Sequence, residues 1–275
     1  MSTRARQLGS TALPRREALD IMSPNKTPRA ETPGLTESTV GATTHSQNRL
    51  LRYLAATDFD GLSGQLERVP VAVHDVLAKQ NEAFTHAYFP ESCVISLVNR
   101  MSDGSGVEVG TIGNEGMAGL PAYLEADASD SDTFCQIAGD AIRVPVPTLI
   151  AAAAANPGIR KLLNRYTQAY MSQVAQSAAC NRLHDIEQRC ARWLLMTHDR
   201  VEGADTFPLK HEFLALMLGV RRAGVTTAAG TLQDKGIIRY RRGVIRVLDR
   251  EALIAASCEC YGIVRRHFDR VIPGL

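Results

Sequence analysis

The 275-residue sequence lacks the features that mark membrane and secreted proteins. Its longest apolar runs, such as LIAAAAA and LALMLGV, are much shorter than the roughly 18 residues that a membrane-spanning helix needs. The first residues show no charged segment followed by an apolar stretch, which is the pattern of a secretory signal. The six cysteines are scattered, so we expect reduced thiols rather than a disulfide framework. These absences predict a globular, cytoplasmic protein that does not bind a membrane.

Signatures of common enzymes and of metal sites are missing as well. No stretch resembles a nucleophile elbow, and the glycine-rich segment GTIGNEGMAG lacks the lysine and the hydroxyl residue of a phosphate-binding loop. We therefore expect no enzymatic activity. Cys258 and Cys260 form a close pair, but zinc would need two further ligands, and His267 is the only obvious neighbour in the sequence. The sequence therefore predicts no metal site.

Positive charge is scarce in one part of the chain and concentrated in another. The net charge of the whole chain is only +2. Residues 48–156 carry a net charge of −8, whereas residues 208–250 carry a net charge of +6. A basic segment of this kind suits a polyanionic partner, so we expect the two parts to have different roles.

Composition and periodicity divide the chain into four segments. Residues 1–47 are rich in Ser, Thr, Pro and Arg and are predicted to be disordered. Residues 48–156 begin with an amphipathic helix and continue as short β-prone runs, which predicts an antiparallel β-barrel or jelly roll. We expect a long helix at residues 157–184 and a domain of helices with a β-hairpin at residues 185–270. The fold class is therefore α+β.

The segment 157–184 has the signals of a single long helix. Asn156 suits the N-cap, and Pro157 suits the first helical position. Large apolar side chains recur at three- and four-residue steps, namely Ile159, Leu163, Tyr166, Tyr170 and Val174. We expect this stripe to form the seam of a parallel homodimer. The alternative is a helix that only packs between two domains of one chain.

The segment around LGVRRAGVTTAAG fits a helix-turn-helix motif. Gly219 stands where the turn needs a left-handed backbone, and the small Ala215 stands where the second helix crosses the first. The positions of a shared apolar core are filled by Leu214, Leu218, Val220 and Val225. Downstream, GIIRYRRGVIRVLD predicts a basic β-hairpin, or wing.

In a winged helix-turn-helix the second helix enters the major groove of DNA with its N-terminal end toward the bases. Here that helix, near residues 221–234, begins with two adjacent arginines, whose side chains suit guanine edges and phosphate. The candidate DNA-binding residues of this helix and of the wing are Arg221, Arg222, Thr226, Thr227, Arg241 and Arg242. The alternative is a solvated basic helix in a domain that binds proteins.

Three parts of the sequence together resemble a bacterial transcription regulator of the Crp/Fnr family. They are HAYFPESCVISLV with VEVGTIGNEGMAGLP, HDIEQRCARWLLMTHDRV, and LGVRRAGVTTAAGTLQDKGIIRYRRGVIRVLDREAL. The resemblance covers about residues 48–270. It implies a cyclic-nucleotide-binding-like barrel, a dimerisation helix and a C-terminal winged helix. The implied partners are double-stranded DNA with a pseudo-palindromic site, a second copy of the chain, and RNA polymerase.

The resemblance also implies roles for individual residues. By position, Arg222 and Thr227 match the residues of the family that contact bases, and Lys210 and His211 match residues that touch phosphate. Ala223 departs from the pattern, because many members have a base-reading glutamate there, so the usual half-site of the family is not expected. The alternative function is a protein-interaction scaffold that uses the barrel and the winged domain without specific DNA readout.

The sensor segment departs further from the family. Its cyclic-AMP receptors have a Gly-Glu-Leu turn and a later arginine, whereas this chain has Gly119-Leu120-Pro121 followed by the acidic stretch EADASDSD. An acidic loop repels a phosphate, so we expect no cyclic AMP. The first cysteine is Cys93, so the sequence has no counterpart of the N-terminal cysteine cluster that iron–sulfur members of the family carry. The effector is therefore unknown.

The sequence leaves two further sensor functions open, haem ligation by a histidine and redox sensing by a cysteine. His74 and His86 are candidate haem ligands, although a lone histidine is more often a surface or hydrogen-bonded residue. Cys180 and Cys190 are candidate redox sensors, with only nearby arginines to support a reactive thiolate.

Overall fold

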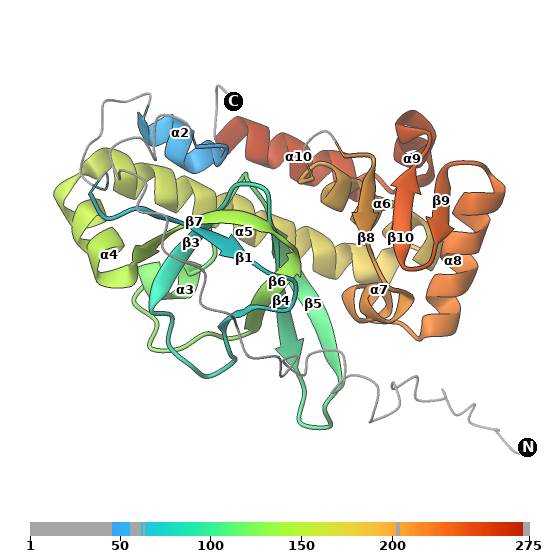
Figure 1. Ribbon diagram of the computed structural model, residues 1–275, viewed down its shortest axis with the longest axis horizontal. Coiled ribbons are helices and arrows are strands. Elements are labelled where there is room, and N and C mark those ends of the chain that lie inside the picture. The colour runs from blue at the N-terminus through green and yellow to red at the C-terminus, as the bar shows by residue number, and fades with distance from the viewer. Residues whose placement is uncertain (1–45, 56–61, 63, 202–203, 272–275) are drawn as a thin grey trace, which may run out of the picture.

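A computed structural model of the protein describes residues 46–55, 62, 64–201 and 204–271 (Figure 1). The segment predicted to be disordered, residues 1–47, lies outside the described residues except for its last two. The elements in chain order are α2 (Arg49–Ala55), β1 (Glu67–Val71), β2 (Val76–Ala78), β3 (His86–Pro90), β4 (Val94–Arg100), β5 (Gly106–Ile112), α3 (Leu120–Tyr123), β6 (Asp132–Ile137), β7 (Gly139–Pro145), α4 (Val146–Ala155), α5 (Pro157–Leu183), α6 (Ile186–His198), β8 (Thr206–Pro208), α7 (His211–Leu218), α8 (Arg222–Asp234), β9 (Ile238–Arg241), β10 (Val244–Val247), α9 (Arg250–Ala256) and α10 (Cys260–Val271).

The first domain, from α2 to α4, contains two antiparallel sheets that share a core. One sheet has the order β1-β7-β3, and the other has the order β2-β6-β4-β5. Side chains from both sheets meet in one apolar cluster, which includes Val71 and Ala141 of the first sheet and Ile95 and Cys135 of the second. Among the described residues the sheets do not close into a barrel. The predicted antiparallel β domain is confirmed as a double sheet of the jelly-roll type.

Local sequence explains how this domain begins and turns. The side-chain amide of the buried Asn48 donates hydrogen bonds to the backbone carbonyls of Pro90 and Gly116 at 2.9 and 2.8 Å. Its carbonyl oxygen accepts from the backbone N–H of Leu50 at 3.0 Å, so the same residue starts α2. The hairpin between β4 and β5 turns at Gly104, which has a φ of 84° and thus the conformation that favours glycine.

Helix α5 is longer than any other helix of the described chain and runs through the middle of the molecule from α4 toward α6 (Figure 1). Its N-cap is Asn156, whose side-chain oxygen accepts from the backbone N–H groups of Gly158 and Ile159 at 2.7 and 3.4 Å. Pro157 occupies the first helical position, as the sequence predicted.

The predicted dimer seam on α5 needs a correction. Ile159, Leu163 and Tyr166 are at most 1% exposed, because they pack in the core of the first domain. The hydroxyl of Tyr166 donates to the backbone carbonyl of Met117 at 2.9 Å. Tyr170 and Val174, on the same stripe, are partly buried in the protomer. These side chains hold α5 against its own chain, so the first three do not form a surface for a partner.

A different face of α5 is exposed. It follows the alternating three- and four-residue spacing of a coiled-coil seam, and its residues are Asn164, Gln168, Met171, Ala175, Ala178 and Arg182. Met171 is 61% exposed, which is unusual for a methionine in the middle of a long helix. The small alanines leave room for a second helix to approach closely.

The winged domain comprises α6 to α9 and a three-stranded sheet of order β8-β10-β9. Strand β8 was not expected from the sequence, because its three residues are too few to show a period. Helix α10 turns away from the winged domain and packs on α5, where Val264 and Phe268 join the core that contains Leu50 and Tyr166. The domain ranges drawn from the sequence placed α10 with the winged domain, whereas Val264 and Phe268 pack in the core of the first domain and Tyr261, at the start of α10, stays in the core of the winged domain.

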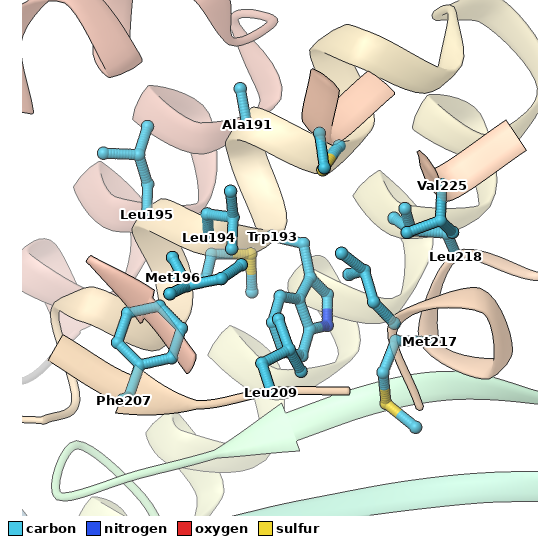
Figure 2. Close-up of a cluster of buried hydrophobic side chains, with 14 of the residues drawn as sticks. Ala191, Trp193, Leu194, Leu195, Met196, Phe207, Leu209, Met217, Leu218 and Val225 are labelled. Atoms are coloured by element: carbon cyan, nitrogen blue, oxygen red, sulfur yellow. The ribbon is translucent and has the colours of Figure 1, made fainter. Parts of the chain in front are cut away.

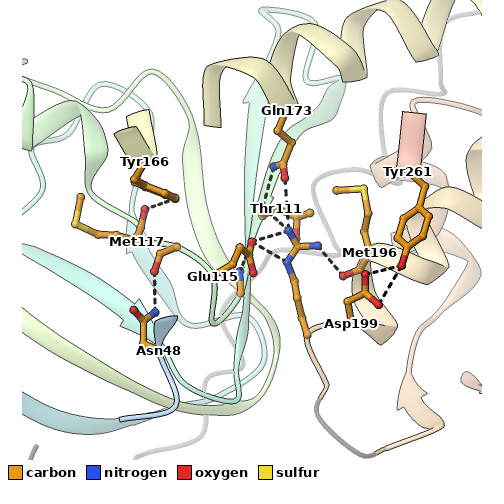
Figure 3. A network of polar contacts seen from close by, with 12 residues as sticks. Asn48, Thr111, Glu115, Met117, Tyr166, Gln173, Met196, Asp199 and Tyr261 are labelled. Carbon is orange, nitrogen blue, oxygen red and sulfur yellow. Dashed lines mark hydrogen bonds and ion pairs between the residues drawn. The ribbon is translucent and has the colours of Figure 1, made fainter. Parts of the chain in front are cut away.

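The two domains contact each other directly. The buried guanidinium of Arg200, just after α6, donates to Glu115 at 2.6 Å and to the carbonyl of Met196 at 2.6 Å (Figure 3). It also reaches Gln173 of α5 at 3.5 Å. A Cβ at Gly113 would lie 2.4 Å from the Cγ of Arg200, so glycine is required there. This network joins the end of α6 to the β5 edge and to α5.

No helix in the described part of the chain is long and apolar enough to span a lipid bilayer.

Candidate nucleic-acid interface

The turn between α7 and α8 has the geometry that the sequence predicted. Gly219 has φ 61° and ψ 38°. The backbone N–H groups of Gly219 and Val220 donate to the carbonyls of Leu216 and Ala215 at 3.2 and 3.0 Å, which is the hydrogen-bond pattern of a Schellman motif. A Cβ at Gly219 would approach the side chain of Val107 on β5 at 3.0 Å. The glycine therefore serves both the turn and the close contact with the first domain.

An apolar core holds α7 and α8 at a fixed angle. Figure 2 shows Trp193 and Leu194 of α6 beside Leu218 of α7 and Val225 of α8. The remaining buried positions of α8 are Ala228, Ala229 and Leu232. Because these residues recur on one side of α8, its opposite side faces solvent.

The N-terminal end of α8 is exposed and positively charged. Arg221 stands at the N-cap position and Arg222 is the first helical residue, and both are exposed. No side chain caps this end, and the first turn contains no acidic residue. The unpaired N–H groups and the helix dipole add to the charge of the two arginines. This end of α8 therefore suits a phosphate or the acceptor edge of a base.

The structure pairs Arg222 with an acidic residue that the sequence analysis did not connect to it. Nη1 of Arg222 lies 2.6 Å from Oε1 of Glu212 in the first turn of α7, and the arginine side chain stays 61% exposed. An exposed pair of this kind contributes about 0–1 kcal/mol, so DNA can displace it. Nothing in the sequence indicated the pair, because it depends on how the two helices cross.

The ring of His211 packs between the wing and α8. Its ring stacks on Tyr240 of β9, with ring centroids 4.2 Å apart, and its Nδ1 lies 3.1 Å from the hydroxyl oxygen of Thr226. Burial lowers the pKa of His211, and the positive charge of Arg222 lowers it further. The imidazole, held between α7, α8 and the wing, positions these elements.

The small residues of α8 divide between two faces. Ala223, Thr226 and Thr227 are exposed, and the two threonine hydroxyls donate to carbonyls one turn earlier at 3.1 Å. Gly224 is half-buried and faces α6, where an added Cβ would lie 3.4 Å from Ile186. Gly224 therefore lies on the side of α8 that packs within the protein, not on the side that faces solvent.

The wing is a tight hairpin whose outer face is basic. Its turn residues, Arg242 and Gly243, have φ values of 52° and 76°, as in the two-residue turns that match strand twist. Arg239 lies opposite Arg246 in the register of β9 and β10. Both are exposed. Arg241 is exposed on the same side of β9.

Lys210 lies beside this wing. The backbone N–H of Leu209 donates to the carbonyl of Gly243 at 2.7 Å, and a Cβ at Gly243 would be 3.7 Å from the Cγ of Lys210. Lys210 is exposed at the N-cap position of α7. The start of α7 and the turn of the wing are therefore adjacent, although Lys210 and Gly243 are far apart in the sequence.

The turn at Gly119 stands where cyclic-AMP receptors have a ligand-binding turn, and packing explains its conformation in this chain. Gly119 has a φ of 103°, and a Cβ there would lie 3.1 Å from the Cα of Ala87. In the acidic loop, Asp132 accepts from the backbone N–H of Gln80 at 2.9 Å and pairs with Arg100. These contacts close the loop onto its own domain.

One group of residues is arranged as metal ligands. Cys180, His184, Cys258 and Cys260 offer ligand atoms that all lie within 4.8 Å of one another. The sequence alone brings together only Cys258 and Cys260, with His267 as a candidate third ligand, and it predicts no metal site. In the structure, Cys180 and His184 at the end of α5 lie beside this pair of cysteines.

Comparisons with known proteins agree with this architecture. Residues 188–256 match the family model of the Crp-like helix-turn-helix domain. The search of curated proteins finds no match. The protein is similar in structure to FixK2 from Bradyrhizobium japonicum, with a TM-score of 0.62 and 16% identity, covering 70% of this chain and 98% of that chain. It is also similar to a CRP/FNR-family transcriptional regulator from Thermus thermophilus, with a TM-score of 0.58 and 19% identity, covering 70% and 98% of the two chains.

The family model covers the helix-turn-helix, and the structural likeness covers nearly the whole length of both related chains. The resemblance found in the sequence is confirmed: the chain has the fold of Crp/Fnr transcription regulators and carries a Crp-like helix-turn-helix domain.

Proposed function

We propose that the protein is a homodimeric transcription regulator that reads a specific DNA sequence with α8. The observation that carries the proposal is the exposed N-terminus of α8, where Arg221 and Arg222 extend from a helix end with no acidic residue in its first turn. Arginine at this position reads the O6 and N7 acceptors of guanine in the major groove. Thr226 and Thr227, one turn further along, offer hydroxyls and methyl groups to neighbouring bases.

The start of α7 and the wing supply contacts to the DNA backbone. Lys210 and the arginines of the wing lie near α8, because the His211 ring contacts both Tyr240 of the wing and Thr226 of α8. Lysine and arginine beside a recognition helix neutralise phosphates and set its register on the duplex. We assign this role to Lys210, Arg241 and Arg242.

The exposed stripe of α5, centred on Met171 and Ala175, is the proposed dimer seam. Two parallel α5 helices packed along this stripe bring the two winged domains to the same side of the dimer. Two α8 helices then read half-sites about one helical turn, roughly 10 bp, apart. The predicted site is therefore a pseudo-palindrome.

The first domain is proposed to work without cyclic AMP. The turn at Gly119 and the loop at Asp132 are supported by contacts within the protein, and the loop would bring acidic side chains to a bound phosphate. RNA polymerase remains an expected partner on the strength of the family resemblance alone.

The test is selection of bound sequences from a random pool of duplex DNA by the purified full-length protein at two salt concentrations. We expect a two-fold symmetric motif and an affinity that falls steeply with salt, since each neutralised phosphate releases counterions. Binding without a motif would contradict specific readout. An affinity for the selected DNA that does not respond to salt would contradict the assigned interface.

A further inference from the structure

The Cys3His cluster, defined as Cys180, His184, Cys258 and Cys260, joins two parts of the fold that are distant in the sequence. Cys180 is in the last turn of α5, and His184 is the residue that ends this helix. Cys258 lies in the short connection from α9 to α10, and Cys260 is the first residue of α10. All six cysteines of the chain are free thiols in the structure.

All four ligand atoms of the cluster lie within 4.8 Å of one another, and two of their separations are close to those of tetrahedral zinc. The Sγ atoms of Cys180 and Cys258 are 3.5 Å apart. Sγ of Cys260 and Nδ1 of His184 are also 3.5 Å apart. With Zn–S bonds of about 2.3 Å and a Zn–N bond of about 2.0 Å, tetrahedral angles place two sulfurs about 3.8 Å apart and a sulfur and a nitrogen about 3.5 Å apart. The ligand atoms need only small movements to enclose an ion.

The cluster is shielded from solvent on its sulfur side. Cys180 and Cys260 are 0% exposed and Cys258 is 4% exposed, whereas the His184 side chain is 16% exposed. Four protein ligands fill a tetrahedral shell, which is the arrangement of structural zinc sites. The edge at His184 provides the route by which an ion enters.

The residues around the cluster orient its ligands. The Nε2 of His184, the ring nitrogen that faces away from the sulfurs, lies 3.2 Å from Oε2 of Glu259. This is the carboxylate–histidine arrangement that fixes the ring of a metal ligand and makes it more basic. The side-chain amide of Gln176 donates to Sγ of Cys260 at 3.1 Å, a contact that stabilises a thiolate.

The charge near the cluster also suits a metal thiolate centre. Zinc with three thiolates and a neutral histidine carries a net charge of −1. Arg192 stabilises a negative charge on Cys180, and Arg189 interacts favourably with both Cys180 and Cys258. The Nε atoms of the two arginines are buried and have no hydrogen-bond partner, so a neighbouring anion would offset the cost of burying them.

We propose that the Cys3His cluster binds one Zn²⁺ ion per protomer as a structural site. Binding deprotonates the three thiols and releases their protons, and it forms three Zn–S bonds and one Zn–N bond. The ion would tie α10 to the end of α5. Because His184 lies at the junction of α5 and α6, the ion would also set the direction in which the winged domain leaves α5. The proposal stands independently of which DNA sequence α8 reads.

The first measurement is the metal content of the full-length protein, purified under reducing conditions without chelator. We expect about one zinc per protomer in the wild type, and little or none in Cys258→Ala and His184→Ala. The matched control is Cys190→Ala, which removes a buried cysteine of α6 that lies outside the cluster. Equal zinc in all four proteins would overturn the assignment of the ligands.

A second measurement keeps the test independent of whether the variants fold. Wild-type protein stripped of metal and held reduced is titrated with Co²⁺, which is coloured where Zn²⁺ is not. We expect stoichiometric binding with the intense absorption of tetrahedral cobalt bound to thiolates, and a higher thermal unfolding temperature after Zn²⁺ is restored. No binding of either ion would overturn the proposal. A disulfide between Cys180 and Cys258 in freshly purified protein, found by mass spectrometry, would replace it with a redox pair.

The variant Glu259→Gln tests the orientation of His184 while all four ligands remain. Loss of an outer-shell partner of this kind weakens metal affinity by about 10- to 100-fold. We expect that loss in competition with a zinc chelator, with the stoichiometry still one. Glu251→Gln, on α9 and outside the cluster, is the control. Unchanged affinity in Glu259→Gln would show that the carboxylate has no role in the site.

Discussion

The indole Nε1 of Trp193 donates a hydrogen bond of 2.9 Å to Oε1 of Glu108 and thereby joins α6 of the winged domain to β5 of the first domain. The hydroxyl of Ser96 donates to the other carboxyl oxygen at 2.7 Å. Burial raises the pKa of Glu108 to about 7, although these two hydrogen bonds and Arg200 act in the opposite direction. A group that titrates near neutral pH therefore lies at the contact between the two domains.

Glu108 should make the protein less stable as pH rises. In the unfolded chain the carboxyl loses its proton near pH 4.5, whereas in the folded protein it keeps the proton up to about pH 7. Unfolding therefore releases a proton in this range, and the free energy of unfolding falls between pH 4.5 and 7 and stays lower above pH 7. This fall in the free energy of unfolding amounts to at most about 3 kcal/mol. We expect it to be absent in Glu108→Gln.

Denaturant unfolding of the wild type and of Glu108→Gln at pH 5 and pH 8 measures this difference. The amide keeps an acceptor for Trp193 and a donor for Ser96, so the variant should fold. Glu82→Gln, at an exposed glutamate, is the control for loss of a negative charge. If the free energy of unfolding changed equally between pH 5 and pH 8 in the wild type and in Glu108→Gln, this carboxyl would not titrate at the domain contact.

Arg222→Ala should lower the affinity for the selected DNA by about 1–3 kcal/mol and relax the preference at one base pair of each half-site, because arginine is assigned to a base edge. The measurement is binding to the selected site and to its single-base variants. Arg270→Ala, on the exposed side of α10, controls for the loss of one positive charge. An unchanged base preference would place Arg222 outside the recognition surface.

Lys210→Ala should weaken binding to all DNA sequences alike, because an ammonium beside the wing contacts phosphate and carries no base preference. Removing one phosphate contact should also reduce the slope of log affinity against log salt by about one. Titrations at four salt concentrations, with specific and random DNA, provide both quantities. Loss of affinity for the specific site alone would mean that Lys210 reads a base.

Met171→Asp should dissociate the dimer, because the substitution places a charge in the middle of the exposed stripe of α5. DNA affinity should fall with it, since the two recognition helices would no longer be linked. Sedimentation velocity measures the oligomeric state. Leu248→Asp changes another exposed apolar residue, 44% exposed and in the winged domain, and should leave the dimer intact. A dimer that survives Met171→Asp would place the interface elsewhere.

Local sequence signals were sufficient for most of the elements. The amide of Asn156 and the ring of Pro157 start α5 through contacts with the nearest residues alone. Gly219 is similar, since its left-handed turn is a property of one residue and its hydrogen bonds stay within a few positions. Such features depend on short-range backbone chemistry, and a sequence displays short-range chemistry directly.

The three-residue and four-residue steps on α5 predicted a helix with a buried stripe but did not specify what buries it. Ile159, Leu163 and Tyr166 proved to face the protomer's own core, whereas the exposed stripe contains asparagine, glutamine, alanine and arginine with a single methionine. Periodicity identifies the buried face of a helix, and the surface that covers it depends on the rest of the fold.

What the sequence by itself determined is therefore most of the elements, the helix-turn-helix with its basic helix, and the charge contrast between the two domains. Only the tertiary structure decided which distant residues meet: Glu212 with Arg222, Trp193 with Glu108, and the end of α5 with the connection from α9 to α10. The physical reason is that each of these contacts joins side chains from elements whose crossing is set by the apolar core as a whole, and no local pattern encodes that crossing.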